Sequence, residues 1–298
     1  MNANDVKVFG VLGAGQMGAG IAQVAAQTGL DVKLCDVSLD VAEKAKRGIE
    51  GQLGRQVDKG KLDAATRDAI VARIHPIGDA SGFAPCDFVV EAATENTALK
   101  IKLLKGVDEV LRPEAFLATN TSSISITKLA AATKRPEKFI GMHFMNPVPV
   151  MKLVEIVKGI ATAPATLDLT RELSVKMGKT VITSNDHPGF MVNRILIPFL
   201  NEACLAFQDG VGSIEDIDQG AKLGLNHPMG PFELSDLIGL DTVLAIAEVL
   251  QTEIGGDKYA PAVLLRNLVA AGWLGRKTKR GFYAYDEKGQ RTGATVTR

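Results

Sequence analysis

A histidine and a glutamate lie on neighbouring apolar segments, and together they could move a proton. His143 sits in the run "KFIGMHFM", and Glu155 follows twelve positions later inside "MKLVEIVKG". Histidine gains and loses a proton near neutral pH, and a carboxylate on its second ring nitrogen would fix the tautomer and stabilise the imidazolium. A carboxylate among apolar residues on an inner strand also needs a partner. The two residues are either a satisfied polar pair in a core or a base with its orienting acid.

A glycine-rich turn near the start of the chain supplies a reason to prefer the second interpretation. "GAGQMG", with Gly13, Gly15, Gln16, Met17 and Gly18, follows an apolar strand and opens a helix, and Asp36 ends the next strand twenty-three positions after the first glycine. This context is the dinucleotide fingerprint, with phosphates at the helix N-terminus and an acid for the ribose diol. The acid would repel a 2′-phosphate, so the pattern predicts NAD. Hydride removal from an alcohol leaves a proton that a histidine can accept.

Several other polar residues could contact ligands. "TNTSSIS" (119–125) closes an apolar run with hydroxyls and an amide, and ligands bind at the carboxyl ends of strands in doubly wound folds. Asn120 and Ser122 could therefore touch a ligand, while Ser123 or Ser125 could cap the following helix instead. Asn193 in "GFMVNR" could face the same cleft or be a surface amide. Lys59 belongs to a small basic group that is either a ligand contact or a solvated helix face.

The elements that would carry these residues alternate between strand and helix up to about residue 187. Apolar β-branched runs at 6–13, 86–94, 115–123, 138–145, 151–159 and 179–186 are separated mostly by helix-like segments, and one long charged helical stretch follows Ser38. The sequence therefore predicts an α/β fold, with an N-terminal Rossmann-type doubly wound, mostly parallel sheet over residues 1–186. The sequence pattern of residues 187–298 indicates helices, which predicts an all-α C-terminal domain.

Composition narrows the class of protein. The chain has 298 residues, 46% of them hydrophobic, with 34 basic and 34 acidic side chains, which argues against nucleic-acid or anionic-membrane partners. Three widely spaced cysteines without a C-x-x-C pair indicate buried thiols in a reducing compartment, and no metal site is expected. No leader and no membrane-length apolar run are recognised, so we expect a soluble cytoplasmic protein. His75, His187 and His227 each precede a proline, which favours turns or extended entry segments.

Taken together, "GAGQMG", "TENTALK", "TNTSS", "GMHFMNPVPVMKLVEIV" and "HPGFMVNR" resemble the L-3-hydroxyacyl-CoA dehydrogenase family, most closely its bacterial 3-hydroxybutyryl-CoA dehydrogenases, over nearly the whole chain. The resemblance implies interconversion of an (S)-3-hydroxyacyl-CoA and the 3-oxoacyl-CoA with NAD. It also implies a helical second domain that binds substrate and forms a homodimer. By position it makes His143 the base, Glu155 its partner, and Ser122 and Asn193 contacts of the reacting end of the substrate. Cofactor-lining positions implied by the resemblance are Glu95, Lys100, Ser122, Asn146 and Lys277, and Lys59 falls near a coenzyme A contact.

Three alternatives stay open at this point. A β-hydroxyacid dehydrogenase similar to 6-phosphogluconate dehydrogenase would carry a lysine four positions after Gly189, where this chain has Asn193. A gulonate-type or other NAD-dependent 3-hydroxyacid dehydrogenase could share the His143–Glu155 pair. A non-catalytic NAD(H)-binding protein on the same fold would not need that pair together with Ser122 and Asn193.

Overall fold

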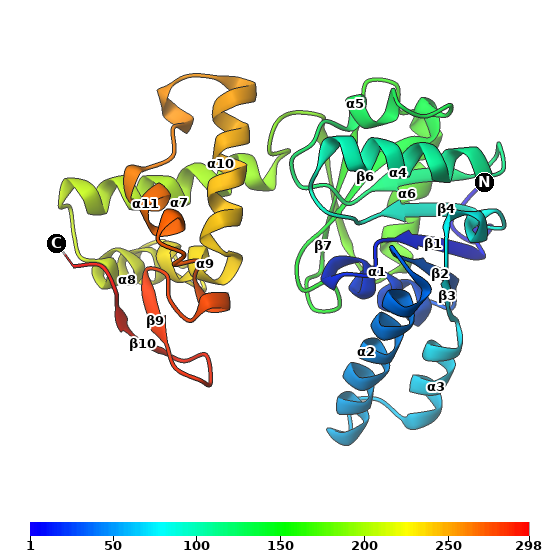
Figure 1. Cartoon of the computed structure of the whole chain (residues 1–298), viewed down its shortest axis with the longest axis horizontal. Helices are drawn as coiled ribbons and strands as arrows, with labels where there is room; N and C mark the ends of the chain where they lie inside the picture. Colours follow the sequence, from blue (N-terminus) through cyan, green and yellow to red (C-terminus); the bar gives the residue numbers. More distant parts are fainter. Residues whose placement is uncertain (298) are drawn as a thin grey trace. The chain divides into compact units, whose positions relative to one another are not determined.

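The computed structural model describes residues 1–297 and divides the chain into two compact units, Met1–His187 and Pro188–Arg298 (Figure 1). Each unit has its own apolar core. The first core gathers around the sheet, with residues such as Phe9, Val90 and Ile140, and the second gathers between helices, with residues such as Phe207 and Leu250.

The first unit is built on an eight-stranded sheet in the order β3-β2-β1-β4-β5-β6-β7-β8. Strands β1 to β6 are parallel to their neighbours, β7 pairs antiparallel with β6, and β8 is parallel to β7. The strands are β1 (Val8–Leu12), β2 (Asp31–Cys35), β3 (Ile74–Ile77), β4 (Phe88–Glu91), β5 (Phe116–Thr119), β6 (Phe139–Phe144), β7 (Leu153–Lys158) and β8 (Thr180–Asn185). The central strands are buried on both faces, which explains their continuous apolar sequence.

Helices cover both faces of this sheet. The helices α1 (Gln16–Gln27) and α6 (Pro164–Lys176) share one apolar cluster with alternate strand residues such as Ile140 and Met142. On the other face a Cβ added to Gly141 would lie 2.8 Å from Ile126 of α5 (Ile126–Ala130), which packs against α4 (Thr97–Val110). The helices α2 (Leu39–Asp58) and α3 (Ala64–Ala72) lie side by side (Figure 1). The predicted mostly parallel sheet with helices on both faces is confirmed.

Two details of the first unit differ from the sequence analysis. The long helical stretch after Ser38 is two helices, α2 and α3, and the chain then forms strand β3 rather than more helix. His75 therefore lies in a strand, which agrees with the extended conformation that the proline after it favours. Strand β3 contains Pro76 and is one of the two edge strands of the sheet, where a residue without an N–H is tolerated.

The second unit is mainly helical, as predicted. Its helices are α7 (Val192–Asp209), α8 (Ile214–Gly224), α9 (Pro231–Ile238), α10 (Leu240–Ile254) and α11 (Val263–Ala270). Gly239, with a φ of 100°, separates α9 from α10. The expectation of a wholly helical unit misses a short hairpin, β9 (Tyr283–Tyr285) with β10 (Arg291–Ala294), whose strands are too short to give a periodic pattern. Within residues 1–297, no helix combines the length and apolarity needed to cross a bilayer.

Candidate active site

His143 and Glu155 face each other across the antiparallel strands β6 and β7, which pair with these two residues in register. Side chains alternate between the faces of a strand, and the neighbours Met142 and Phe144 belong to the cluster under α1 and α6. His143 and Glu155 therefore lie on the opposite face. The Nδ1 atom of His143 is 3.1 Å from Oε2 of Glu155, and the two residues are 7% and 0% exposed. This geometry fixes the imidazole ring against a buried carboxylate.

The glycine-rich turn lies between β1 and α1. Gly13 has a φ of +102°, and a Cβ there would lie 2.6 Å from the carbonyl oxygen of Ala92. A Cβ on Gly18 would lie 1.7 Å from the carbonyl oxygen of Gly13. A Cβ on Gly15 would instead meet no described atom within 4 Å. Packing within the protein accounts for Gly13 and Gly18, whereas Gly15 is the N-cap of α1 and leaves room for a ligand at the helix N-terminus.

Asp36 follows β2 and lies beside this turn. One oxygen of its carboxylate accepts a hydrogen bond from the Ala14 N–H, and the other accepts one from the Val37 N–H at 2.7 Å. The carboxylate thus fixes the glycine turn, and its remaining lone pairs can accept from a ribose diol. A 2′-phosphate in the same place would meet like charge.

A cavity of about 370 Å³ adjoins the glycine turn. The turn contributes Gly15 and Gln16, α1 contributes Gly20, and the loop after β6 contributes Asn146 and its neighbours. Helix α2 forms another wall. The α2 residues that line the cavity are Val41, Lys44, Ala45, Gly48, Ile49 and Gln52.

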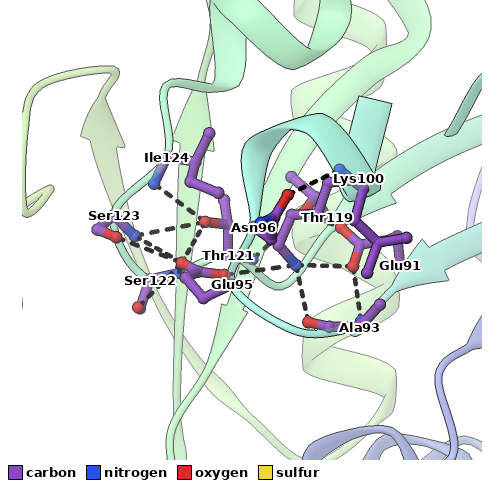
Figure 2. A network of polar contacts seen from close by, with 11 residues as sticks. Glu91, Ala93, Glu95, Asn96, Lys100, Thr119, Thr121, Ser122, Ser123 and Ile124 are labelled. Atoms are coloured by element: carbon purple, nitrogen blue, oxygen red, sulfur yellow. Dashed lines mark hydrogen bonds and ion pairs between the residues drawn. The ribbon is translucent and has the colours of Figure 1, made fainter. Parts of the chain in front are cut away.

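Glu95 clamps the turn that carries Ser122 (Figure 2). Its Oε1 atom accepts from the N–H groups of Ser122 and Ser123 at 2.8 and 3.2 Å and from the Thr121 hydroxyl at 2.5 Å. The Ser122 hydroxyl also donates to the same oxygen at 3.2 Å. Burial alone would raise the pKa of Glu95, but Lys100 and these hydrogen bonds lower it below its usual value. The clamp is therefore anionic at neutral pH.

A buried ion pair between Lys100 and Glu91 lies next to Glu95 and positions it. The Nζ atom of Lys100, whose side chain is 1% exposed, lies 2.7 Å from Oε1 of Glu91 and 3.4 Å from Oε2 of Glu95. Glu91 is 0% exposed and also accepts from the Ala93 N–H at 2.6 Å and the Thr119 hydroxyl at 2.7 Å (Figure 2). These bonds join the ends of β4 and β5 to the first turn of α4. Breaking such a pair on one side costs about 3–5 kcal/mol.

Asn120 connects this region to the histidine strand. Its side-chain oxygen accepts from the Phe144 N–H at 2.8 Å, next to His143, and its own N–H donates to the Glu91 carbonyl at 2.7 Å. The structure thus gives the amide oxygen of Asn120 a role in joining β5 to β6, and its predicted ligand contact stays a prediction.

The structure brings together most of the predicted residues of the first unit. The glycine turn, Asp36, Gln16 and Asn146 surround or adjoin the cavity, and Glu95, Lys100 and Ser122 form one network. Met17 packs against the core. Ser125 caps α5, because its hydroxyl accepts from the Lys128 N–H. Lys59 is exposed at the C-terminal end of α2, beyond the residues that line the cavity.

Two predicted residues belong to the second unit. Asn193 lies in the first turn of α7 and is 9% exposed. The ammonium of Lys277 is paired with the carboxylate of Asp241, at 2.5 and 2.6 Å from its two oxygens. Their predicted contacts with substrate and cofactor stay predictions.

Sequence reasoning missed Glu91, and it included Thr119 and Thr121 only as unnamed members of the polar stretch "TNTSSIS". A signal for the first was present, because Glu91 in "FVVEAAT" follows a buried apolar run, as Glu155 lies within one. The two threonines gave no individual signal beyond that stretch, since a threonine at a strand end is ordinary.

The arrangement suits proton transfer beside a bound dinucleotide. A turn with an open glycine at a helix N-terminus can hold a pyrophosphate. On the same sheet a histidine held by a buried carboxylate can exchange a proton, and the polar turn at Ser122 can hold a reacting oxygen.

Comparison with family models assigns both halves of the chain. Residues 8–187 match the model described as "3-hydroxyacyl-CoA dehydrogenase, NAD binding domain", and residues 189–285 match "3-hydroxyacyl-CoA dehydrogenase, C-terminal domain".

Similar proteins have been named accordingly. A probable 3-hydroxybutyryl-CoA dehydrogenase of Deinococcus radiodurans is 53% identical over 277 residues, covering 93% of this chain and 99% of that protein. The 3-hydroxybutyryl-CoA dehydrogenase of Bradyrhizobium diazoefficiens is 52% identical over 280 residues, covering 94% and 96%. The crystal structure of (S)-3-hydroxybutyryl-CoA dehydrogenase from Ralstonia eutropha matches with a TM-score of 0.92 at 49% identity, covering 95% of this chain and 100% of that one.

Proposed function

We propose that this chain, which belongs to the 3-hydroxyacyl-CoA dehydrogenase family, interconverts (S)-3-hydroxybutyryl-CoA and acetoacetyl-CoA, with His143 as general acid and base. The chain is an NAD-dependent oxidoreductase, and NAD is its cofactor. The short acyl chain follows the names of relatives that are about half identical in sequence. The observation that supports the chemistry is the buried His143–Glu155 pair, with Nδ1 and Oε2 3.1 Å apart.

The residues around the glycine turn fit NAD. Gly15 leaves open space at the N-cap of α1, where backbone N–H groups favour phosphate, and Asp36 offers acceptors for a ribose diol. When bound, NAD supplies the acceptor or donor of the hydride. Every proton movement then falls to side chains of the protein.

His143 carries the proton in this proposal. With Nδ1–H donated to Glu155, Nε2 is the acceptor of the neutral ring and takes the hydroxyl proton during oxidation. In reduction the imidazolium gives that proton to the forming alkoxide. Glu155 stays ionised, holds the ring and offsets its positive charge. Ser122, which Glu95 positions, and Asn193 would orient the reacting end of the substrate.

The same proposal assigns roles to the two parts of the chain. Residues 1–186 would bind the cofactor, and residues 187–298 would bind the acyl-CoA with them and form a homodimer. Lys59 would contact the coenzyme A moiety. Light scattering of the purified protein tests the dimer, and a monomeric mass would overturn that part.

NADH oxidation tests the activity directly. We expect acetoacetyl-CoA to drive it, whereas a sugar-acid ketone or no substrate leaves NADH intact. His143→Gln should bind NADH normally and lose roughly 10²–10⁴-fold in kcat, the usual contribution of positioned acid–base catalysis. NADH binding without turnover of any 3-oxoacyl-CoA would favour a non-catalytic NAD(H)-binding protein. Turnover of the sugar-acid ketone alone would favour a gulonate-type enzyme.

A further inference from the structure

Lys179 is a buried lysine that the proposed mechanism does not use. It directly precedes β8, is 8% exposed, and its Nζ atom lies 2.5 Å from the Val148 carbonyl oxygen and 2.8 Å from that of Met151. Burial lowers the pKa of its ammonium, with no charged neighbour contributing to the shift. No carboxylate of residues 1–297 lies within ion-pair distance of it. Burying an ammonium without a counter-ion costs free energy. The hydrogen bonds from Lys179 to the two carbonyl oxygens offset part of that cost.

Those carbonyls belong to the loop 146–151, "NPVPVM", which joins β6 to β7 and thus the strands of His143 and Glu155. Pro147 and Pro149 have no N–H to donate. Within the loop, the N–H groups of Val150 and Met151 both donate to the Pro147 carbonyl, at 3.0 and 2.9 Å. The carbonyls of Val148 and Met151 receive their donors from Lys179 instead.

The same loop lines the cavity beside the glycine turn, through Asn146, Pro147, Val148 and Pro149. The loop also approaches α1 closely, because a Cβ added to Gly20 would lie 2.8 Å from Cβ of Val148. The loop is therefore held between Gly20 of α1 and the ammonium of Lys179. Any relaxation of the lysine contacts would let this wall of the cavity move.

We propose that Lys179 is a positioning residue, which holds the 146–151 loop in place and so sets the shape of the cavity for the ligand that occupies it. The ammonium does not touch the reacting atoms, and it acts through the carbonyls of Val148 and Met151. This inference rests on the proposed function, in that the cavity serves NAD(H) or the acyl-CoA. Loss of the Lys179 ammonium therefore weakens ligand binding more than it slows the chemical step.

The test compares Lys179→Met, which keeps the length of the side chain and removes its donors, with Lys176→Met as the matched control. Lys176 ends α6 and donates to the Ala3 carbonyl at 3.2 Å, away from the loop. The readouts on the full chain are the NADH dissociation constant by fluorescence titration, the KM for acetoacetyl-CoA, and kcat. For Lys179→Met we expect the NADH dissociation constant, the KM for acetoacetyl-CoA, or both to rise about tenfold or more, with kcat within about threefold of wild type. Lys179→Arg, which can donate to both carbonyls, should recover most of the loss, and Lys176→Met should match wild type.

Two results would overturn the proposal. One is a Lys179→Met protein with reduced thermal stability but unchanged KM and NADH affinity, because it would assign the lysine to folding alone. The other is a fall in kcat with the NADH dissociation constant and the KM for acetoacetyl-CoA unchanged. If Lys179→Met does not fold, Lys179→Gln is measured instead under the same criteria. If the wild type fails to reduce acetoacetyl-CoA, the proposed function fails, and the NADH dissociation constant alone decides the role of Lys179.

Discussion

Replacing Glu155 by glutamine removes the charge beside His143 and leaves the volume of the side chain. At 3.1 Å between Nδ1 and Oε2, Coulomb's law with an effective dielectric constant of about 20 gives roughly 5 kcal/mol for an imidazolium and a carboxylate. This is a ceiling, since the glutamine carbonyl can still accept the Nδ1–H and a hydrogen bond contributes about 1 kcal/mol net. We expect a loss of about 2–4 kcal/mol in the step that needs imidazolium, or roughly 30- to 1000-fold in kcat.

The assay is kcat against pH in both directions for wild type, Glu155→Gln and His143→Gln, with NADH affinity as the control for folding. Ketone reduction consumes a proton, so it should weaken as pH rises through neutrality, while alcohol oxidation strengthens. In Glu155→Gln the imidazolium has no counter-charge. Reduction should therefore be lost at lower pH than in wild type, and oxidation should persist to lower pH.

Glu155→Gln with the wild-type rate and an unmoved pH profile would refute this reasoning. The pair would then be a buried hydrogen bond between β6 and β7, and the proton would come from another group. A variant that cannot bind NADH would instead show that the carboxylate is needed for folding, and His143→Gln alone would then test the acid–base role.

The remaining predictions concern the cofactor, the second unit and its buried acids. Asp36→Ser should lower the preference for NADH over NADPH in kcat/KM by about tenfold or more, because the like charge is gone; an unchanged ratio would show that another group discriminates. Asn193→Ala should lower kcat about tenfold with NADH affinity retained, as expected for one hydrogen bond to the reacting end; lost NADH affinity with normal kcat would contradict this. Burial raises the pKa of Asp236 to about 6, against hydrogen bonds from the Tyr283 and Phe282 N–H groups and the Tyr285 hydroxyl. The folded chain then binds more protons than the unfolded chain between about pH 4 and 6, so this carboxyl costs stability as pH rises through that window, on the order of 2–3 kcal/mol. The advantage of wild type over Asp236→Asn in denaturant unfolding should accordingly be larger at pH 4 than at pH 7, and an equal difference would refute it.

The fold was predictable because parallel strands buried on both faces leave continuous apolar runs between helices. The exceptions have physical causes. Strand β3 has four residues, includes Pro76 and lies at the sheet edge, so it carries neither an apolar run nor a full ladder of N–H groups. The hairpin β9–β10 depends on Asp236, whose carboxylate accepts from the N–H groups of Phe282 and Tyr283 at 2.9 Å. A strand held by a helix residue 47 positions away has no local signature.

The candidate site was predictable where a residue type was unusual for the sequence around it. Glu155 within an apolar strand indicated a partner, and the register of β6 against β7 supplies it. Glu91 gave a similar signal but no recognisable partner in the sequence, because Lys100 reaches it from the following helix. Lys179 gave none, since a lysine in the short connection between a helix and a strand is ordinary, and only the three-dimensional structure shows that its side chain is buried.

The buried charges of the first unit serve geometry more than stability. An apolar pair of the same volume as Glu91 and Lys100 could be as stable, since desolvation offsets much of the attraction between buried charges. An apolar pair could not hold the Ala93 N–H and the Thr119 hydroxyl, or place a cation 3.4 Å from Glu95. The turn at residues 92–93 in turn packs on Gly13, where a Cβ would lie 2.6 Å from the Ala92 carbonyl oxygen. One ion pair thus supports both the glycine turn and the clamp on Ser122, so ligand geometry should respond to its loss even where the chain still folds.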